Sequence, residues 1–133
     1  MVVDFQTFIL DNKNYVEKVS DKKQIVIGNS LSNDLKYING WRKRFGGNYK
    51  NTTTFSIDKK GNIYQHFDDK YYSKTIGVES LDKNIITITL ENVGWLNKDL
   101  IKDRHIDWVG NIYKRRAKVI DKRWRGFRYW EPY

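Results

Sequence analysis

Residues 84–90 constrain the fold most, because apolar and polar side chains alternate along them. Ile86, Ile88 and Leu90 fall on one side of the segment, and Thr87 and Thr89 fall on the other. Successive side chains of a β-strand point to opposite faces of its sheet. The pattern therefore predicts a strand with its isoleucine side on a core and its threonine side toward a cleft or solvent.

Three further segments favour β-structure. Residues 24–27 are a short β-branched run between polar stretches, and they predict a buried strand. Residues 54–57 and 62–67 flank the turn sequence Asp58-Lys59-Lys60-Gly61, in which aspartate can bond to its own backbone and glycine can take a positive φ. This spacing predicts a hairpin. A second hairpin is predicted for residues 107–115, with its turn at Gly110-Asn111.

One helix is predicted after the first strand. Leu35, Ile38, Trp41 and Phe45 recur at near-helical spacing, Ser32 can accept amides at the start, and Gly46-Gly47 can end the helix. Together these patterns predict the α/β class, with a central mixed β-sheet and a packed helix. We expect residues 1–23 to form an N-terminal arm and residues 24–133 to form a single domain.

The composition limits the chemistry. The 133 residues include no cysteine, so disulfides, thiolate metal ligands and cysteine nucleophiles are excluded. No apolar run approaches the roughly 20 residues that cross a bilayer, and the first ten residues lack the pattern of a signal peptide. We therefore expect no membrane partner.

The chain is strongly basic. Twenty-five Lys and Arg residues against 16 Asp and Glu give a formal net charge of +9, which attracts anionic partners. The candidate binding residues combine basic and aromatic side chains: Trp95, Arg115, Arg116, Lys118, Lys122, Arg123, Trp124 and Arg125. Such a mixture can bind phosphates and stack bases, and it can equally be a solvated face whose aromatic residues belong to a core. Trp95 is the tryptophan that we expect to be exposed.

The order of these motifs resembles that of the type-2 N-acetylmuramoyl-L-alanine amidases, above all the phage-type members. That family shares its fold with the peptidoglycan recognition proteins. The matching motifs are the first strand with Gly28-Asn29-Ser30, Trp41-Arg42, the hairpin sequence Gly61-Asn62-Ile63-Tyr64-Gln65, the alternating strand, and residues 125–131. The resemblance implies that residues 24–133 form a truncated amidase-like fold without the usual C-terminal part.

The resemblance also implies where a catalytic site would lie. Such amidases hold a zinc ion with two histidines and a Cys or Asp, and a nearby side chain assists proton transfer. The matching positions here are degenerate: Gly28, Asn29, Ser30, Thr53, Thr54, Thr75 and Thr89. Glycine offers no ligand, an asparagine amide is a poor one, and threonine has no carboxylate. We therefore expect no catalytic residue, no metal and no cofactor.

These inferences lead to a functional expectation with two alternatives. The chain is expected to be a catalytically inactive amidase-like module of a bacteriophage, in the virion or at the cell wall. Its expected partners are other subunits of a larger assembly, with peptidoglycan, another acidic polymer and nucleic acid as further candidates. The expected location is the bacterial cytoplasm or the phage particle. The alternatives are an active zinc amidase completed by another chain and a nucleic-acid-binding or polymerase-binding regulator.

Two catalytic constellations can also be drawn from isolated residues. His66, His105 and Asp107 could hold a structural zinc, although no ligand spacing supports this. Ser30, His66 and Asp68 could form a triad, but no nucleophile-elbow sequence surrounds Ser30. We expect structural roles for all of these residues.

Overall fold

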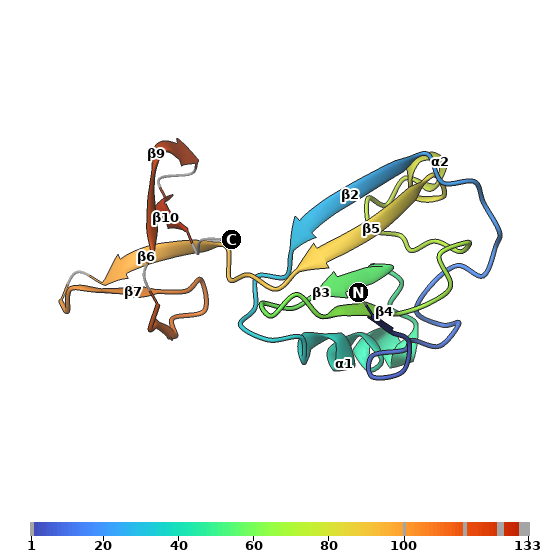
Figure 1. The fold of residues 1–133 in the computed structure, drawn as a ribbon, viewed down its shortest axis with the longest axis horizontal. Coiled ribbons are helices and arrows are strands. Elements are labelled where there is room, and N and C mark those ends of the chain that lie inside the picture. Colours follow the sequence, from blue (N-terminus) through green and yellow to red (C-terminus); the bar gives the residue numbers. More distant parts are fainter. Residues whose placement is uncertain (1, 100, 116, 125–126, 131–133) are drawn as a thin grey trace.

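The chain is organised by two five-stranded sheets joined by a short link at residues 91–94 (Figure 1). The computed structural model describes residues 2–99, 101–115, 117–124 and 127–130, and beyond residue 117 it describes the backbone alone. The strand order is β1-β4-β3-β5-β2 in the first sheet and β8-β7-β6-β10-β9 in the second. None of the described helices is long or apolar enough to span a lipid bilayer.

The first sheet is mixed, and short helices accompany it. In sheet order its strands are β1 (Val3–Asp4), β4 (Ile63–Gln65), β3 (Phe55–Ile57), β5 (Ile85–Leu90) and β2 (Gln24–Asn29). Strand β3 pairs antiparallel with β4, whereas the pairs β1–β4, β3–β5 and β2–β5 are parallel. The helical segments are α1 (Tyr37–Trp41), the 3₁₀ segment η1 (Arg44–Gly47) and α2 (Glu79–Asp82). The fold is thus of the α/β kind, with a mixed sheet and few short helices.

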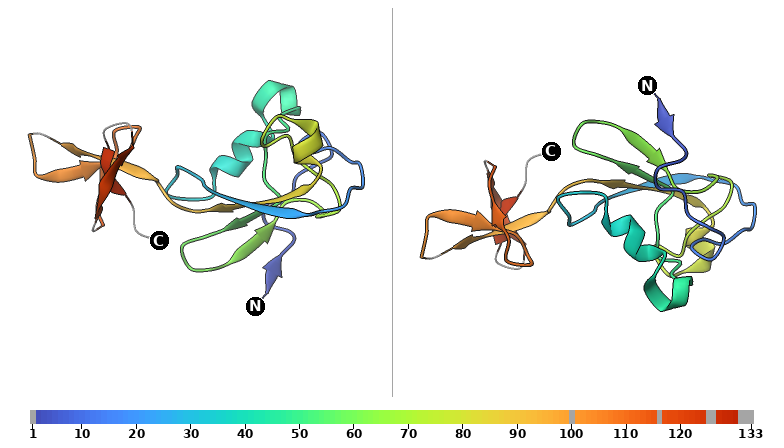
Figure 2. Two further views of the ribbon diagram at one scale, coloured as in Figure 1. Left: turned by 90° about the horizontal axis from the view of Figure 1, so that it is seen from above. Right: turned by 90° about the horizontal axis from the view of Figure 1, so that it is seen from below.

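The helices lie on one side of the first sheet (Figure 2). We call that side the helix-side face and the opposite side the open face. The main core lies on the helix-side face and consists of Leu10, Leu35, Ile38, Trp41 and Phe67. Burying each such apolar side chain stabilises the fold by about 1.5–3 kcal/mol.

The alternation in β5 is confirmed, but the predicted burial of its two sides is wrong. Thr87 and Thr89 are buried on the helix-side face, whereas Ile86 and Ile88 are half-buried on the open face. The threonines tolerate burial because their hydroxyls find partners. The amide of Thr54 donates to Thr87 Oγ1 at 2.9 Å, and the amide of Thr87 donates back to Thr54 Oγ1 at 3.4 Å.

Strand β2 forms as predicted, but it is not buried. It lies at the edge of the sheet and pairs with β5 alone among the described strands. Ile25 is 62% exposed and Ile27 is 64% exposed. An apolar β-branched run is typical of strands, but it does not distinguish a central strand from an edge strand.

The predicted helix is shorter than expected. Leu35, Ile38 and Trp41 are buried as the spacing predicts. Phe45 departs from the pattern, because its φ of +50° leaves the helical region and its side chain is 80% exposed. Helical geometry therefore ends before Phe45, one turn earlier than the apolar spacing predicts.

Both predicted hairpins form, but the first strand of the second hairpin begins at Arg104 and ends before residue 107, where the sequence predicted that strand to start. Strands β3 and β4 are joined by a turn in which Asp58 Oδ1 accepts the amides of Lys60 and Asn62, each at 2.9 Å, and Gly61 takes a φ of +85°. In the second sheet, β7 (Arg104–Ile106) pairs antiparallel with β8 (Ile112–Tyr113). The remaining strands of that sheet are β6 (Trp95–Asp99), β9 (Lys118–Trp124) and β10 (Phe127–Trp130).

The N-terminal 23 residues pack closely against the first sheet and α1. Besides β1, they contribute an isolated bridge between Val16 and Tyr72. Asn14 is fully buried, and its amide nitrogen lies 3.1 Å from the carbonyl oxygens of Trp41, Gly47 and Tyr49. This side chain ties the segment to the turn that follows α1.

Candidate functional site

A cleft of about 720 Å³ opens where β2 and β5 end, between α1 and the β7–β8 turn. Its volume lies within the usual range of small-molecule sites, about 300–1,000 Å³. The lining comes from four places: the loop after β2, α1 and the segment following it, the stretch before β3, and the β7–β8 turn. The lining residues are Asn29, Ser30, Leu31, Ser32, Asn33, Asp34, Tyr37, Trp41, Arg44, Tyr49, Asn51, Thr53, Thr89, Asp107, Trp108, Val109 and Asn111.

Aromatic side chains occupy two sides of this cleft. On the α1 side, Tyr37 and Trp41 meet edge to face with ring centroids 5.2 Å apart, and Arg44 lies over the ring of Tyr49 at 5.1 Å. On the other side, Trp108 is 50% exposed, and its indole nitrogen donates to the carbonyl oxygen of Leu31 at 2.8 Å. Flat, partly exposed rings offer a large contact area at little cost in side-chain entropy.

Two buried hydroxyls in the lining have no hydrogen-bond partner of normal geometry among the described residues. They are Tyr37 Oη and Thr53 Oγ1. Burial raises the pKa of the Tyr37 phenol, and the nearby hydroxyls of Ser56 and Thr89 oppose that rise. Tyr37 therefore stays protonated at neutral pH and can donate a hydrogen bond. Buried polar groups are nearly always paired, so a ligand would pair these two oxygens once a movement of the lining uncovers them.

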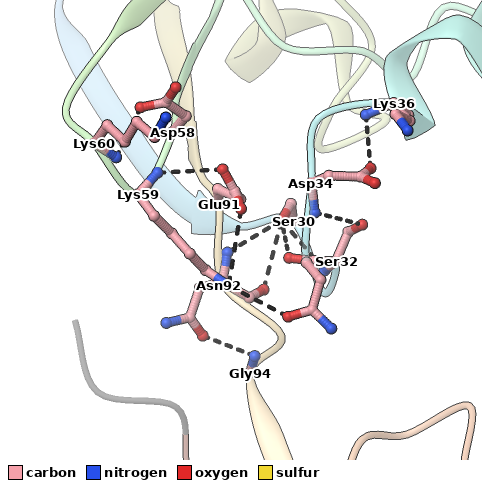
Figure 3. A network of polar contacts seen from close by, with 11 residues as sticks. Ser30, Ser32, Asp34, Lys36, Asp58, Lys59, Lys60, Glu91, Asn92 and Gly94 are labelled. Atoms are coloured by element: carbon pink, nitrogen blue, oxygen red, sulfur yellow. Dashed lines mark hydrogen bonds and ion pairs between the residues drawn. The ribbon is translucent and has the colours of Figure 1, made fainter. Parts of the chain in front are cut away.

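The floor of the cleft meets the link between the two sheets in a polar network (Figure 3). Ser30 Oγ accepts the amides of Ser32 at 3.3 Å and of Asn92 at 3.2 Å. Asn92 Oδ1 accepts the amide of Gly94 at 2.7 Å. The hydroxyl of Ser30 is therefore engaged in holding the backbone of this link, which is a structural role.

The same network includes an ion pair near the end of β5. Lys59 Nζ lies 3.8 Å from a carboxylate oxygen of Glu91, and the second oxygen of Glu91 accepts the amide of Lys59 at 3.2 Å. Glu91 thereby fixes the β3–β4 turn against the end of β5. It is outside the set of residues that line the cleft.

The structure brings together four of the seven positions that match the amidase site. Asn29, Ser30, Thr53 and Thr89 line the cleft. The other three lie elsewhere: Gly28 pairs with Thr89 in the sheet, Thr54 bonds to Thr87, and Thr75 Oγ1 donates to the carbonyl oxygen of Thr52 at 2.8 Å.

The side chains at the cleft do not fit a zinc ion. The lining offers hydroxyls, amides, two aspartates and an arginine, but no imidazole or thiolate. The residues that the structure describes contain no group of three or more His, Cys, Asp or Glu side chains placed to hold a metal. His66, His105 and Asp107 are not brought together. Asp107 instead caps its own turn, accepting the amides of Val109 at 3.1 Å and Asn111 at 2.8 Å.

His66 has a serine partner that the sequence did not indicate. Its Nε2 lies 2.8 Å from Ser56 Oγ, and its Nδ1 lies 3.0 Å from the carbonyl oxygen of Phe8. Because a carbonyl only accepts, Nδ1 carries the proton and Nε2 accepts from Ser56. Both residues are fully buried, so this pair cannot reach a substrate.

The structure does not assemble Ser30, His66 and Asp68 into a triad. Ser30 bonds to the link and His66 bonds to Ser56. Asp68 is exposed and pairs with Lys70 Nζ at 2.7 Å. The three side chains form no hydrogen-bonded set.

The candidate binding residues at the basic C-terminal end lie largely outside the described part of the chain. Arg116 and Arg125 are outside it, as are the side chains of Lys118, Lys122, Arg123 and Trp124. Arg115 is exposed and lines a small hollow beside Asn33. Trp95 is half-buried on β6, so its predicted exposure is wrong.

Trp108 is the exposed tryptophan among those whose side chains are described, and the sequence reasoning missed its role. The predicted hairpin of residues 107–115 placed Trp108 in a strand, whereas the structure places it in the β7–β8 turn, where a large aromatic side chain has little core to enter. Tyr37, Arg44 and Tyr49 carried no signal of a role in the cleft either. Tyr37 reaches the cleft from α1 itself, whereas Arg44 and Tyr49 reach it from the segment that follows α1.

The chain matches no protein-family model, no curated protein and no solved structure. The resemblance to the type-2 amidases therefore stays a prediction. The account of the cleft depends on its own residues.

Proposed function

We propose that this chain is a binding module without catalytic activity, and that its cleft holds a glycan. The observation that carries the proposal is the composition of the cleft. Aromatic rings stand on two sides, and between them the buried hydroxyls of Tyr37 and Thr53 have no hydrogen-bond partner of normal geometry among the described residues. A sugar ring presents apolar C–H groups to an aromatic face and hydroxyls at its rim, so it suits such a lining.

The proposed source of the glycan is peptidoglycan. The motif order of the sequence, which resembles that of phage-type amidases, suggests this source. A module that keeps the shape of such a site but lacks zinc ligands would hold the cell-wall strand without cutting it. A phage particle or a wall-associated assembly is the setting that we propose.

Calorimetric titration of the full chain with soluble peptidoglycan fragments and N-acetylglucosamine oligomers tests the proposal. We expect binding that weakens by about 30-fold in Trp108→Ala, because removing a central aromatic contact typically costs about 2 kcal/mol. Tyr37→Phe removes the hydroxyl alone and should weaken binding by about tenfold. Phe5→Ala is the matched control, since Phe5 is 58% exposed on the N-terminal segment and is not among the cleft-lining residues.

Two results would contradict the proposal. One is the absence of glycan binding, or binding that Trp108→Ala leaves unchanged. The other is release of muropeptides from peptidoglycan in the presence of zinc, abolished by a chelator. That second result would instead support the alternative of an active amidase.

A further inference from the structure

A second surface on this chain is suited to binding another protein strand, and it is independent of the cleft function. It is the outer edge of β2, the last strand of the first sheet (Figure 1). Its six residues read Gln-Ile-Val-Ile-Gly-Asn and include no charged residue and no proline. Natural proteins usually protect an exposed edge with charges, prolines or bulges, because an open edge is a template for pairing.

The backbone of β2 is presented regularly along this edge. The strand runs in continuous parallel register with β5, from Gln24 opposite Ile85 to Asn29 opposite Leu90. The amides of Gln24 and Ser30 bond to the β5 side, at 3.2 Å to Asn84 and 2.9 Å to Leu90. Since backbone groups alternate in direction along a strand, those of Ile25 and Ile27 point outward.

The side chains of this strand are self-complementary. We propose that β2 pairs antiparallel with β2 of a second copy of this chain, about a two-fold axis at Val26. In that register Ile25 of one copy lies opposite Ile27 of the other, and the outward backbone groups of both residues form hydrogen bonds. A two-fold axis brings the same surface of both copies together, so that surface must be complementary to itself. A register centred on Val26 meets this requirement, because it places each isoleucine of β2 opposite an isoleucine of the other copy.

Charge also favours this register. Lys23 of one copy lies opposite Asn29 of the other, and Asp21 lies opposite Leu31, so no like charges face one another across the new ladder. The exposed fractions of Ile25 and Ile27, 62% and 64%, provide apolar surface for the pair to bury. The result is a continuous ten-stranded sheet with the helices of both copies on the same face. A ladder this short predicts a weak dimer, visible at micromolar to millimolar concentration.

Sedimentation velocity of the full chain over a concentration series tests the dimer. We expect the mean mass to rise from the 16.0 kDa of one chain toward twice that value. Ile27→Lys should abolish this rise by placing two like charges within the ladder. Ile101→Lys is the matched control, because it makes the same charge change at a 91% exposed isoleucine in the β6–β7 turn and should leave dimerisation intact. A mass that stays at one chain throughout, or dimerisation that survives Ile27→Lys, would overturn the proposal.

A cysteine test checks the register without relying on a disruptive change. The chain has no cysteine, so Val26→Cys introduces a single thiol at the proposed two-fold axis. Directly opposed residues of a non-hydrogen-bonded pair are close enough for a disulfide. Mild oxidation should cross-link Val26→Cys much faster than Ile101→Cys, whose thiol would be more exposed. Equal rates for the two variants would refute the register.

Discussion

At the residue scale, polar side chains carry much of the architecture. The buried amide of Asn14 faces three carbonyl oxygens around the end of α1, and Ser30 joins the end of β2 to the link between the sheets. Each such group would cost about 1–3 kcal/mol if it were buried without a partner. The first sheet can therefore bury threonine, serine and histidine beneath a small helix where a larger apolar core would be expected.

His66 makes the stability of the fold depend on pH. Burial lowers its pKa from 6.5 to about 4, the hydrogen bond to Phe8 opposes this shift, and the charge of Arg42 adds to it. The unfolded chain therefore binds a proton between about pH 6.5 and 4 that the folded chain does not, and stability is lost as the pH falls through that window. The loss amounts to about 3 kcal/mol.

Urea denaturation between pH 4 and pH 7 measures this effect. The free energy of unfolding of the wild type should fall toward pH 4 with the slope expected when unfolding takes up one proton. In His66→Gln this contribution to the pH dependence should be absent. His105→Gln serves as the control, because His105 is only half-buried on β7. An unchanged pH dependence in His66→Gln would show that the acid sensitivity arises elsewhere.

At the element scale, the residues within the turns predicted the hairpins. The apolar periodicity of the longer segments was a less reliable guide to burial and to the length of the helix. The β3–β4 hairpin follows from Asp58 and Gly61, whose preferences act within the turn itself. The burial of β2 and of the isoleucine side of β5 could not be predicted, because it depends on which strands become neighbours and which face α1 covers. The sequence placed Asn29, Ser30 and Thr89 at the candidate site, and all three line the cleft. It did not predict the aromatic side chains on the two sides of the cleft.

The link between the sheets depends on Gly94. Its φ is +74°, and a Cβ there would lie 2.7 Å from Leu31 Cδ2 and 3.3 Å from Asn29 Nδ2. Gly94→Ala should destabilise the fold by about 2–3 kcal/mol, since backbone strain and crowding act together.

Gly110→Ala is the matched control for this change. Gly110 has a φ of +92° but open space around its Cα, so only the backbone strain of about 1 kcal/mol applies. Chemical denaturation gives both free energies of unfolding. If the two variants lost equal stability, the close contact of Gly94 with Leu31 and Asn29 would have no energetic role.

At the scale of the whole molecule, function depends on how the two sheets meet. The first sheet supplies the α1 side of the cleft, and the β7–β8 turn of the second sheet supplies Trp108, which bonds back to Leu31. Neither sheet alone forms the cleft. The cleft lies where β2 and β5 end, and its proposed glycan chemistry comes from the aromatic and hydroxyl groups gathered there.

Chemical-shift mapping by NMR is the most direct test of the central claim, that this cleft binds a glycan. On titration with a soluble peptidoglycan fragment, the largest shifts should fall on the indole N–H of Trp108, on the amides of residues 29–34 and on Thr89. Strand β9, at the opposite edge of the second sheet from β8, should remain unchanged. Shifts confined to β9 and β10, or no shifts at saturating glycan, would contradict the proposal.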